Sequence, residues 1–180
     1  MYKLCVTEKS AKNQVLLEEA FLRLALRQNY DSITISDICR EAGLSRKVYY
    51  RLFENKNDVL YALIDHTLGS FEAYEPEEEP LHRFFSYWKK NRLVLDVLDK
   101  NGCNAVLMDR VVRFVLSYNP SILLAIYPGL MDWDRDTQMF YIAGLFGMML
   151  DWHVRGFGNS VEEISHSLLN ILAAPLHPYG

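Results

Sequence analysis

Apolar residues recur at intervals of three and four along most of the chain, which is the spacing of helices with one buried face. The pattern predicts a first helix that opens at Thr7 or Ser10 and ends near residue 27. Further helices are expected over about 34–42, 45–53, 55–71, 81–98, 105–118 and 161–173, with another from Asp132 or Asp134 to about residue 155. Pro120 and the pair Pro128-Gly129 are expected to interrupt the chain before that last-named helix. The sequence therefore predicts an all-α fold.

Residues 33–58 carry the most informative local pattern. Thr34 is expected to cap a short helix, with Asp37 three residues later completing a capping box. Gly43 can adopt the positive φ that ends a helix without a Cβ clash, and Ser45 can cap the next helix. These signals predict two short helices joined by a tight turn.

The second of these helices has two different sides. Its apolar side is expected to pack on the first helix and comprises Val48, Tyr49, Leu52 and Phe53. Its opposite side is basic and aromatic and comprises Arg46, Lys47, Tyr50 and Arg51. Arginine and lysine can donate to guanine edges or phosphates, and a tyrosine hydroxyl can donate to a phosphate. The pattern is typical of a DNA-binding helix-turn-helix, although a basic helix side can also simply face solvent.

The same segment resembles the N-terminal domain of the tetracycline-repressor-like (TetR) regulators. The motif Ala42-Gly43-Leu44-Ser45 and residues Tyr50, Phe53 and Lys56 match the family pattern, and the similarity begins at residues 20–24 and continues through 30–34. Val48 stands where the family usually has threonine, and Leu52 where it often has histidine or another polar residue. The resemblance implies a three-helix helix-turn-helix domain over residues 1–58 that binds a palindromic double-stranded DNA operator, followed by a helical ligand-sensing and dimerisation domain over 59–180.

Within this interpretation, each candidate residue has an expected role at DNA. Arg46 and Lys47 are expected to contact base edges, and the remaining candidates to contact or lie beside phosphates. Lys56 is assigned to a phosphate at the N-terminus of the helix that Asn55 caps. The full set is Thr34, Ser36, Arg46, Lys47, Tyr50, Arg51 and Lys56.

The net charge of −4 is unevenly distributed along the chain. Residues 1–58 contain ten Lys and Arg against eight Asp and Glu, whereas residues 59–180 contain nine against fifteen. The acidic part would be repelled by phosphate, so the asymmetry favours an approach to DNA by the N-terminal part.

Other compositional features limit the remaining function classes. No N-terminal signal segment is recognisable, and the longest apolar run, residues 139–150, is too short to span a bilayer. Three scattered cysteines fit a reducing cytoplasm better than a disulfide framework or zinc site, and Cys39 is expected to be a small buried residue. The five histidines are isolated, and no phosphate-binding loop or H-E-x-x-H motif occurs. We therefore expect no enzyme, cofactor, metal or membrane association.

The last two predicted helices are more apolar than a small domain can bury alone. The sequence Ser160-Val-Glu-Glu163 forms a capping box before the final helix, and Gly156 and Gly158 are expected to end the preceding one. A C₂ homodimer built as a four-helix bundle is expected, although Gly144 and Gly147 can equally serve helix packing within one subunit. The expected interface residues are Tyr141, Gly144, Met148, Ile164, Leu168 and Ile171.

By family resemblance, aromatic and flexible apolar residues of the later helices would surround a small-molecule effector. The set is Tyr87, Trp88, Phe114, Tyr118, Met148 and Trp152. Such stripes are also typical of an ordinary core. The sequence thus favours a dimeric transcriptional repressor released by an effector. The alternative is a helical small-molecule binding or protein-interaction module that does not read DNA.

Overall fold

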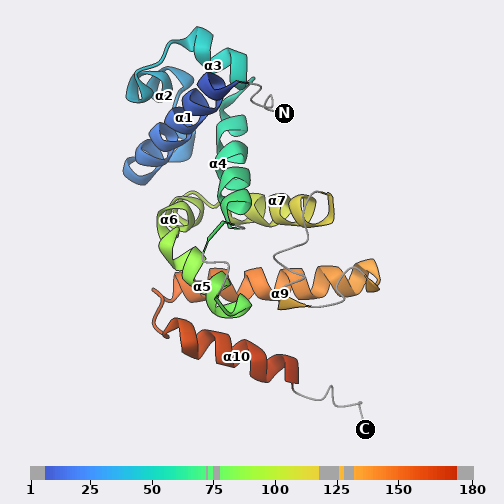
Figure 1. The fold of residues 1–180 in the computed structure, drawn as a ribbon. Helices are drawn as coiled ribbons and strands as arrows, with labels where there is room; N and C mark the ends of the chain where they lie inside the picture. Colours follow the sequence, from blue (N-terminus) through green and yellow to red (C-terminus); the bar gives the residue numbers. More distant parts are fainter. Residues whose placement is uncertain (1–6, 72, 75–77, 118–125, 128–131, 174–180) are drawn as a thin grey trace. The chain divides into compact units, whose positions relative to one another are not determined.

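The computed structural model describes residues 7–71, 73–74, 78–117, 126–127 and 132–173. All regular elements in these ranges are helical, as the sequence predicted (Figure 1). They are α1 (Glu8–Arg27), the 3-10 turn η1 (Tyr30–Ser32), α2 (Ile35–Ala42), α3 (Arg46–Leu52), α4 (Lys56–Ser70), α5 (Pro80–Lys90), α6 (Arg92–Lys100), α7 (Asn104–Ser117), α9 (Arg135–Val154) and α10 (Val161–Ala173).

Most predicted helix ends are confirmed by hydrogen bonds at the caps. Thr7 and Asp134 accept bonds from backbone N–H groups in the first turns of α1 and α9, and Ser160 and Glu163 form the expected reciprocal box before α10. Gly156 has a φ of 70° just after α9. The interruptions expected at Pro120 and Pro128-Gly129 lie outside the described residues.

One helix boundary was predicted wrongly. Residues 81–98 were expected to form one helix, but α5 and α6 are separate, with Asn91 between them. The Asn91 side-chain amide donates to the Tyr87 carbonyl oxygen at 2.9 Å, and the Asn91 backbone N–H donates to the same oxygen at 3.0 Å where α5 ends. Pro80 occupies the first turn of α5, where its missing N–H costs nothing, and Glu79 caps the helix.

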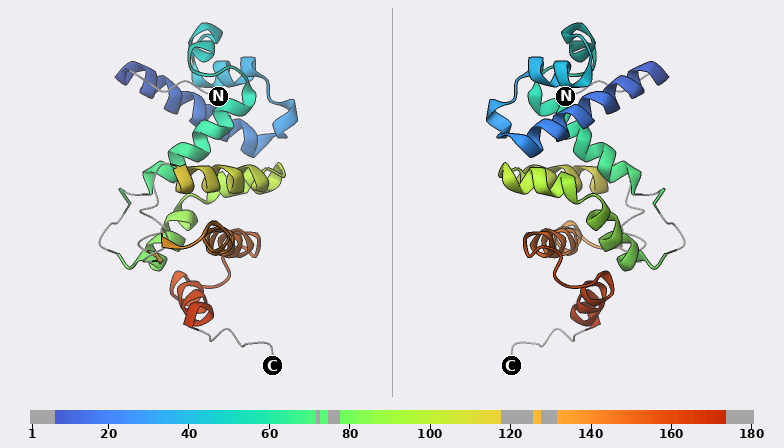
Figure 2. Two further views of the ribbon diagram at one scale, coloured as in Figure 1. Left: turned by 90° about the vertical axis from the view of Figure 1, so that its right-hand side faces the viewer. Right: turned by 90° about the vertical axis from the view of Figure 1, so that its left-hand side faces the viewer.

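The described residues pack into two compact units. The first contains those within Met1–Ser70 and Arg92–Asn119, and the second those within Phe71–Asn91 and Pro120–Gly180. In the first unit, α1 packs against α2, α3, α4 and α6, and α7 packs on α4 and α6. Figure 2 shows α1, α2 and α3 from two sides. The predicted boundary at residue 58 concerns function rather than packing and stays a prediction.

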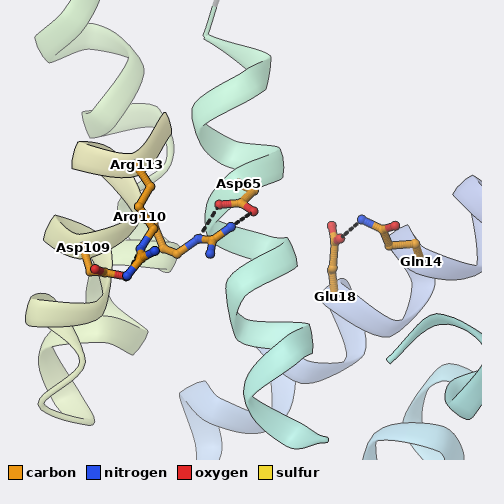
Figure 3. A network of polar contacts seen from close by, with 6 residues as sticks. All are labelled: Gln14, Glu18, Asp65, Asp109, Arg110 and Arg113. Carbon is orange, nitrogen blue, oxygen red and sulfur yellow. Dashed lines mark hydrogen bonds and ion pairs between the residues drawn. The ribbon is translucent and has the colours of Figure 1, made fainter. Parts of the chain in front are cut away.

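Two neighbouring residues of α4 hold that helix to different partners, and Figure 3 shows one of these contacts, between Asp65 and Arg110. The His66 Nδ1 lies 2.8 Å from an oxygen of Glu18 on α1, a carboxylate that is only 2% exposed and also accepts from Gln14 at 2.7 Å. Asp65 accepts two hydrogen bonds from the guanidinium of Arg110 on α7, the Nε bond at 2.8 Å. These pairings, of which only the Glu18 carboxylate is fully buried, favour one placement of α4 between α1 and α7.

The second unit has an aromatic core. Phe84 and Trp88 of α5 meet Phe146 of α9 edge to face at 5.2 and 5.8 Å, and Phe85 meets Trp152 at 5.5 Å. α5 also packs on α10, so it contacts both C-terminal helices. Edge-to-face contacts of this kind are favourable beyond their buried area.

The His66–Glu18 contact predicts a pH dependence of stability. The hydrogen bond to Glu18 raises the pKa of His66 above its ordinary value, against the opposing effect of partial burial. The charged form of His66 therefore stabilises the fold. This stabilisation is fully present below the unfolded-state pKa of His66 and is lost as the pH rises through the folded-state pKa. We expect His66→Gln to lower the free energy of unfolding by roughly 0.5–1 kcal/mol at about pH 5.5 and by less at about pH 8.5. The expected loss is small because the imidazole is half exposed and solvent screens its charge.

Chemical denaturation at the two pH values measures this difference. His166→Gln is the matched control, because His166 is an exposed residue of α10. An equal loss at both pH values for His66→Gln would contradict the assigned cause.

Candidate nucleic-acid interface

The first helix of the helix-turn-helix begins at the predicted capping box. The Thr34 hydroxyl oxygen accepts from the Asp37 N–H at 3.1 Å, and the Asp37 carboxylate accepts from the Thr34 N–H at 3.0 Å. The hydrogen bonds from Thr34, with a smaller contribution from Arg40, hold the pKa of Asp37 below its ordinary value. The start of α2 is therefore fixed by local bonds that the sequence pattern specifies.

The turn between α2 and α3 also forms as predicted. Gly43 has φ 66° and ψ 26°, a left-handed conformation that disfavours any residue with a Cβ. The Leu44 N–H reaches back to the Cys39 carbonyl oxygen at 2.9 Å, which closes the end of α2. The Ser45 hydroxyl oxygen then accepts from the Val48 N–H at 3.4 Å and begins α3.

The inner side of α3 is buried. Tyr49, Leu52 and Phe53 are in the core, and Val48 is half-buried. The Tyr49 hydroxyl donates to the Asn55 carbonyl oxygen at 3.0 Å, and burial raises the pKa of that hydroxyl. Cys39 lies in the same core, as expected, and burial raises the pKa of its thiol. The side chain of Tyr49 thus links α3 to the start of α4.

The outer side of α3 carries the predicted cations. Arg46, Lys47 and Arg51 are exposed, and the ring of Tyr50 is 44% exposed beside them. The Arg46 guanidinium donates to the Tyr50 hydroxyl at 3.3 Å and lies 5.8 Å from the centre of its ring, and this bond raises the pKa of Arg46. Thr34 and Ser36, at the start of α2, are exposed too.

The cations of α3 differ from those of the neighbouring helices in their partners. On α1 and α2, Arg23 and Arg27 pair with Glu41 at 3.0 and 2.9 Å, and Arg40 pairs with Asp37. Among the residues that the structure describes, neither Lys47 nor Arg51 has an acidic partner, and Arg46 bonds only to a hydroxyl. The uncompensated positive charge of this region is therefore concentrated on α3.

Lys56, the remaining candidate, is directed toward its own chain. Its ammonium donates to the Tyr30 carbonyl oxygen at 2.7 Å and to that of Asp31 at 3.4 Å, and it lies 4.1 Å from the centre of the Tyr30 ring. Asn55 accepts from the N–H groups of Asn57 and Asp58, which confirms it as the cap of α4. The expected phosphate contact of Lys56 stays a prediction.

The predicted dimer residues fall on different sides of α9 and α10. Gly144 and Ile171 are exposed, and Tyr141 and Met148 are half-buried. Ile164 and Leu168 are buried within the subunit, each 4% exposed. Three large exposed apolar residues of these helices were not among the predicted interface residues: Phe140, Val154 and Leu169.

The exposed residues of α9 form a continuous apolar stripe. Phe140 and Val154 are 73% and 62% exposed at its two ends, with Ala143, Gly144 and Gly147 between them and Asp151 as its one charged member. The spacing of three and four residues places them along one side of the helix. The opposite side is buried in the subunit, so α9 is apolar on both sides. This all-round apolar pattern is the sequence signal that could have identified Phe140 and Val154.

The predicted effector residues do not all lie in one unit. Tyr87, Trp88 and Trp152 are buried in the aromatic core of the second unit, and Met148 is half-buried there. Phe114 belongs to the first unit, and Tyr118 lies outside the described residues. Three buried polar residues of the second unit were missed because their helices read as apolar: Gln138, His153 and Ser165.

The described residues contain neither a metal-binding cluster nor a membrane-spanning helix. No group of three or more His, Cys, Asp or Glu side chains there is arranged to hold a metal ion. No helix in the described ranges is long and apolar enough to cross a membrane.

Comparisons with known proteins bear on the same elements. Residues 17–63, from α1 into α4, match the family model "Bacterial regulatory proteins, tetR family". No curated protein sequence matches the chain.

Solved structures extend the similarity to most of the chain. A Clostridium perfringens protein provisionally named a fatty acid metabolism regulator is 16% identical, with a TM-score of 0.57 over 87% of this chain and 96% of that one. The dihydroxyacetone kinase operon activator DhaS is 19% identical, with a TM-score of 0.55 over 89% of this chain and 93% of that one. At these identities the similarity shows a shared fold. Together these comparisons show a helix-turn-helix domain of the tetR type at residues 17–63, within a chain whose fold resembles those of the two solved proteins.

Proposed function

We propose that this protein is a cytoplasmic, non-enzymatic TetR-like repressor that binds a palindromic operator as a homodimer and is released by a small-molecule effector. The observation that carries the DNA-binding part is the outer side of α3, where the cations lack acidic partners among the described residues. DhaS is named an operon activator, so a promoter-reporter assay with the gene deleted and restored is needed to distinguish repression from activation.

The buried inner side of α3 supports this proposal. A helix of seven residues is not stable alone, so its orientation comes from the packing of Tyr49, Leu52 and Phe53. With that side fixed in the core, Arg46, Lys47 and Arg51 are presented together to solvent. A rigid cationic helix of this kind suits the major groove, where sequence can be read from base edges.

The hydrogen bond between Arg46 and Tyr50 suggests how the contacts divide. It restrains the Arg46 guanidinium, so we assign Arg46, with Lys47, to base edges. Tyr50 and Arg51, one turn along α3, are assigned to phosphates. Thr34 and Ser36 are also assigned to phosphates from the start of α2.

Two arginine variants test this division after operator sequences have been selected from random DNA. Arg46→Ala should relax the base preference, with a loss of about 1–3 kcal/mol against the preferred operator. Arg51→Ala should weaken all sequences alike and reduce the slope of log affinity against log salt by about 1 per subunit. Fluorescence anisotropy over a salt series measures both quantities.

Arg113→Ala, on an exposed side chain of α7, is the control and should leave binding unchanged. An equal loss of specificity from both α3 variants would contradict the division of roles. Failure of the wild-type protein to bind mixed genomic fragments at low salt would favour the alternative, a helical small-molecule binding or protein-interaction module that does not read DNA. The net charge of −4 is the feature that supports this alternative.

The exposed stripe of α9 supports the homodimer. A helix that is apolar on both sides is normally buried on both, and the subunit covers only one of them. α10 runs back in the opposite direction (Figure 1) and adds exposed Leu169 and Ile171. Two copies of this helix pair would bury both stripes in a four-helix bundle. A dimer also supplies two recognition helices for a palindrome with half-sites about 34 Å apart.

A charge introduced into the stripe tests the interface. An added Cβ at Gly147 meets nothing within 4 Å inside the subunit, so Gly147→Arg should leave the subunit folded. A charge buried at a dimer interface costs about 3 kcal/mol, so the dimer dissociation constant should rise about 100-fold or more. Sedimentation equilibrium measures this constant.

Gly69→Arg is the matched control, because Gly69 is also helical, exposed and unobstructed, but lies on α4. Its dimer constant should equal that of the wild type. A Gly147→Arg protein that dimerises as tightly as the wild type would exclude α9 from the interface.

The polar groups buried in the second unit support an effector. Ser165 is 5% exposed, and its hydroxyl oxygen has no hydrogen-bond partner within the described part of the chain. Buried polar atoms are usually paired, so this hydroxyl is available to a polar ligand group beside the aromatic core. A ligand that prefers a subunit geometry unable to bind DNA would shift the population away from the operator.

Thermal-shift screening of a metabolite library, followed by operator-release assays, tests this part. We expect at least one compound that raises the melting temperature and weakens operator binding, with both responses reduced in Ser165→Ala. Ser167→Ala, on the exposed side of α10, is the control. A library in which stabilising compounds never affect operator binding would contradict the effector proposal.

A further inference from the structure

The turn η1 leads from α1 into α2 and is held by side chains from two other parts of the first unit. From α4, Lys56 donates to the carbonyl oxygens of Tyr30 and Asp31 and covers the Tyr30 ring. The Tyr30 hydroxyl donates in turn to Asn57, also on α4. The chain reaches Thr34, the cap of α2, four residues after Tyr30.

The second contact comes from the connection between α6 and α7. The Asn101 side-chain oxygen accepts from the Tyr30 N–H at 2.7 Å, and its amide donates to the Val97 carbonyl oxygen at 2.7 Å, which orients it. The neighbouring Lys100 donates to the Leu26 carbonyl oxygen at 2.8 Å, in the last turn of α1. The N–H and the carbonyl oxygen of Tyr30 are thus bonded to different segments.

The bonding of Lys56 distinguishes it from the cations of α3. Its ammonium already has two carbonyl acceptors and an aromatic face, and its side chain is half-buried, whereas Lys47 and Arg51 are exposed. Moving Lys56 to a phosphate would leave the two carbonyl oxygens without this donor and break the cation–π contact.

We propose that Lys56 and Asn101 are positioning residues for DNA reading, which act by fixing η1 and therefore the place at which α2 and α3 begin. This inference rests on the DNA-binding function proposed above. It assigns to Lys56 a role that does not require contact with DNA. It also connects the segment between α6 and α7, through Tyr30, to the turn that precedes α2 and α3.

Lys56→Met tests the proposal, because methionine keeps an unbranched apolar side chain but removes the charge and the donors. Without DNA, the melting temperature should fall by about 5 °C, as expected for loss of a charged hydrogen bond in a chain of this size. Operator affinity should fall about tenfold with an unchanged salt slope, because no phosphate contact is lost. Lys56→Arg should restore both properties in part.

Arg51→Met is the matched control on α3, because Arg51 is the exposed cation that we assign to a phosphate. It should leave the melting temperature unchanged and reduce the salt slope by about 1 per subunit. The same result for Lys56→Met would overturn the proposal and make Lys56 a phosphate contact.

Asn101→Ala provides the second, milder variant. It should accelerate amide hydrogen exchange at Tyr30 and lower operator affinity without changing the salt slope. Because both side chains hold one turn, Lys56→Met and Asn101→Ala together should lower the melting temperature by less than the sum of the single changes. Strict additivity would contradict a shared turn. If the wild-type protein binds no DNA, the proposed function fails, while the melting and exchange measurements still decide whether these residues hold η1.

Discussion

The burial of one side of α3 is the constraint on which the interpretation of this protein depends. Tyr49, Leu52 and Phe53 are in the core, and the Tyr49 hydroxyl is bonded to the backbone at Asn55. Because α3 has only seven residues, these contacts rather than helix propensity fix its rotation about its own axis. Its remaining side is then committed to solvent, and that side carries the unpaired cations. The packing of one side of α3 therefore decides which side chains the other side can offer to a partner.

Local pairing explains how a chain of net charge −4 can present a cationic surface. Glu41 pairs with two arginines of α1, and Asp37 pairs with Arg40, so the positive charge of α1 and α2 is largely compensated where it occurs. The described part of α3 has no carboxylate. At the distances over which salt screens charges, the composition of one helix matters more to a nearby phosphate than the total charge of the chain.

The parts of the fold that sequence could predict are those specified by residues close together in the chain. The capping boxes at Thr34 and Ser160 and the left-handed Gly43 each involve neighbours within a few positions, and all form as expected. The break at Asn91 was missed because the apolar spacing continues across it, and only a side-chain bond to the Tyr87 carbonyl oxygen marks the end of α5. The Tyr30–Asn101 bond spans 71 positions and has no local signal. Periodicity likewise placed Ile164 and Leu168 on the apolar side of α10. It could not show that this side is covered by the same subunit, because that packing is long-range.

The long-range contacts that sequence could not predict are also those through which a regulator of this kind can be controlled. Reading a palindrome requires that two α3 helices meet one duplex together, so specificity depends on the placement of each helix as well as on its side chains. Within the first unit that placement is set by side chains remote from α3 in sequence: Arg110 and Glu18 through α4, and Asn101 through η1. If the protein binds DNA as proposed, its binding can therefore be controlled without contact to the recognition helix, through a change in the residues that hold it.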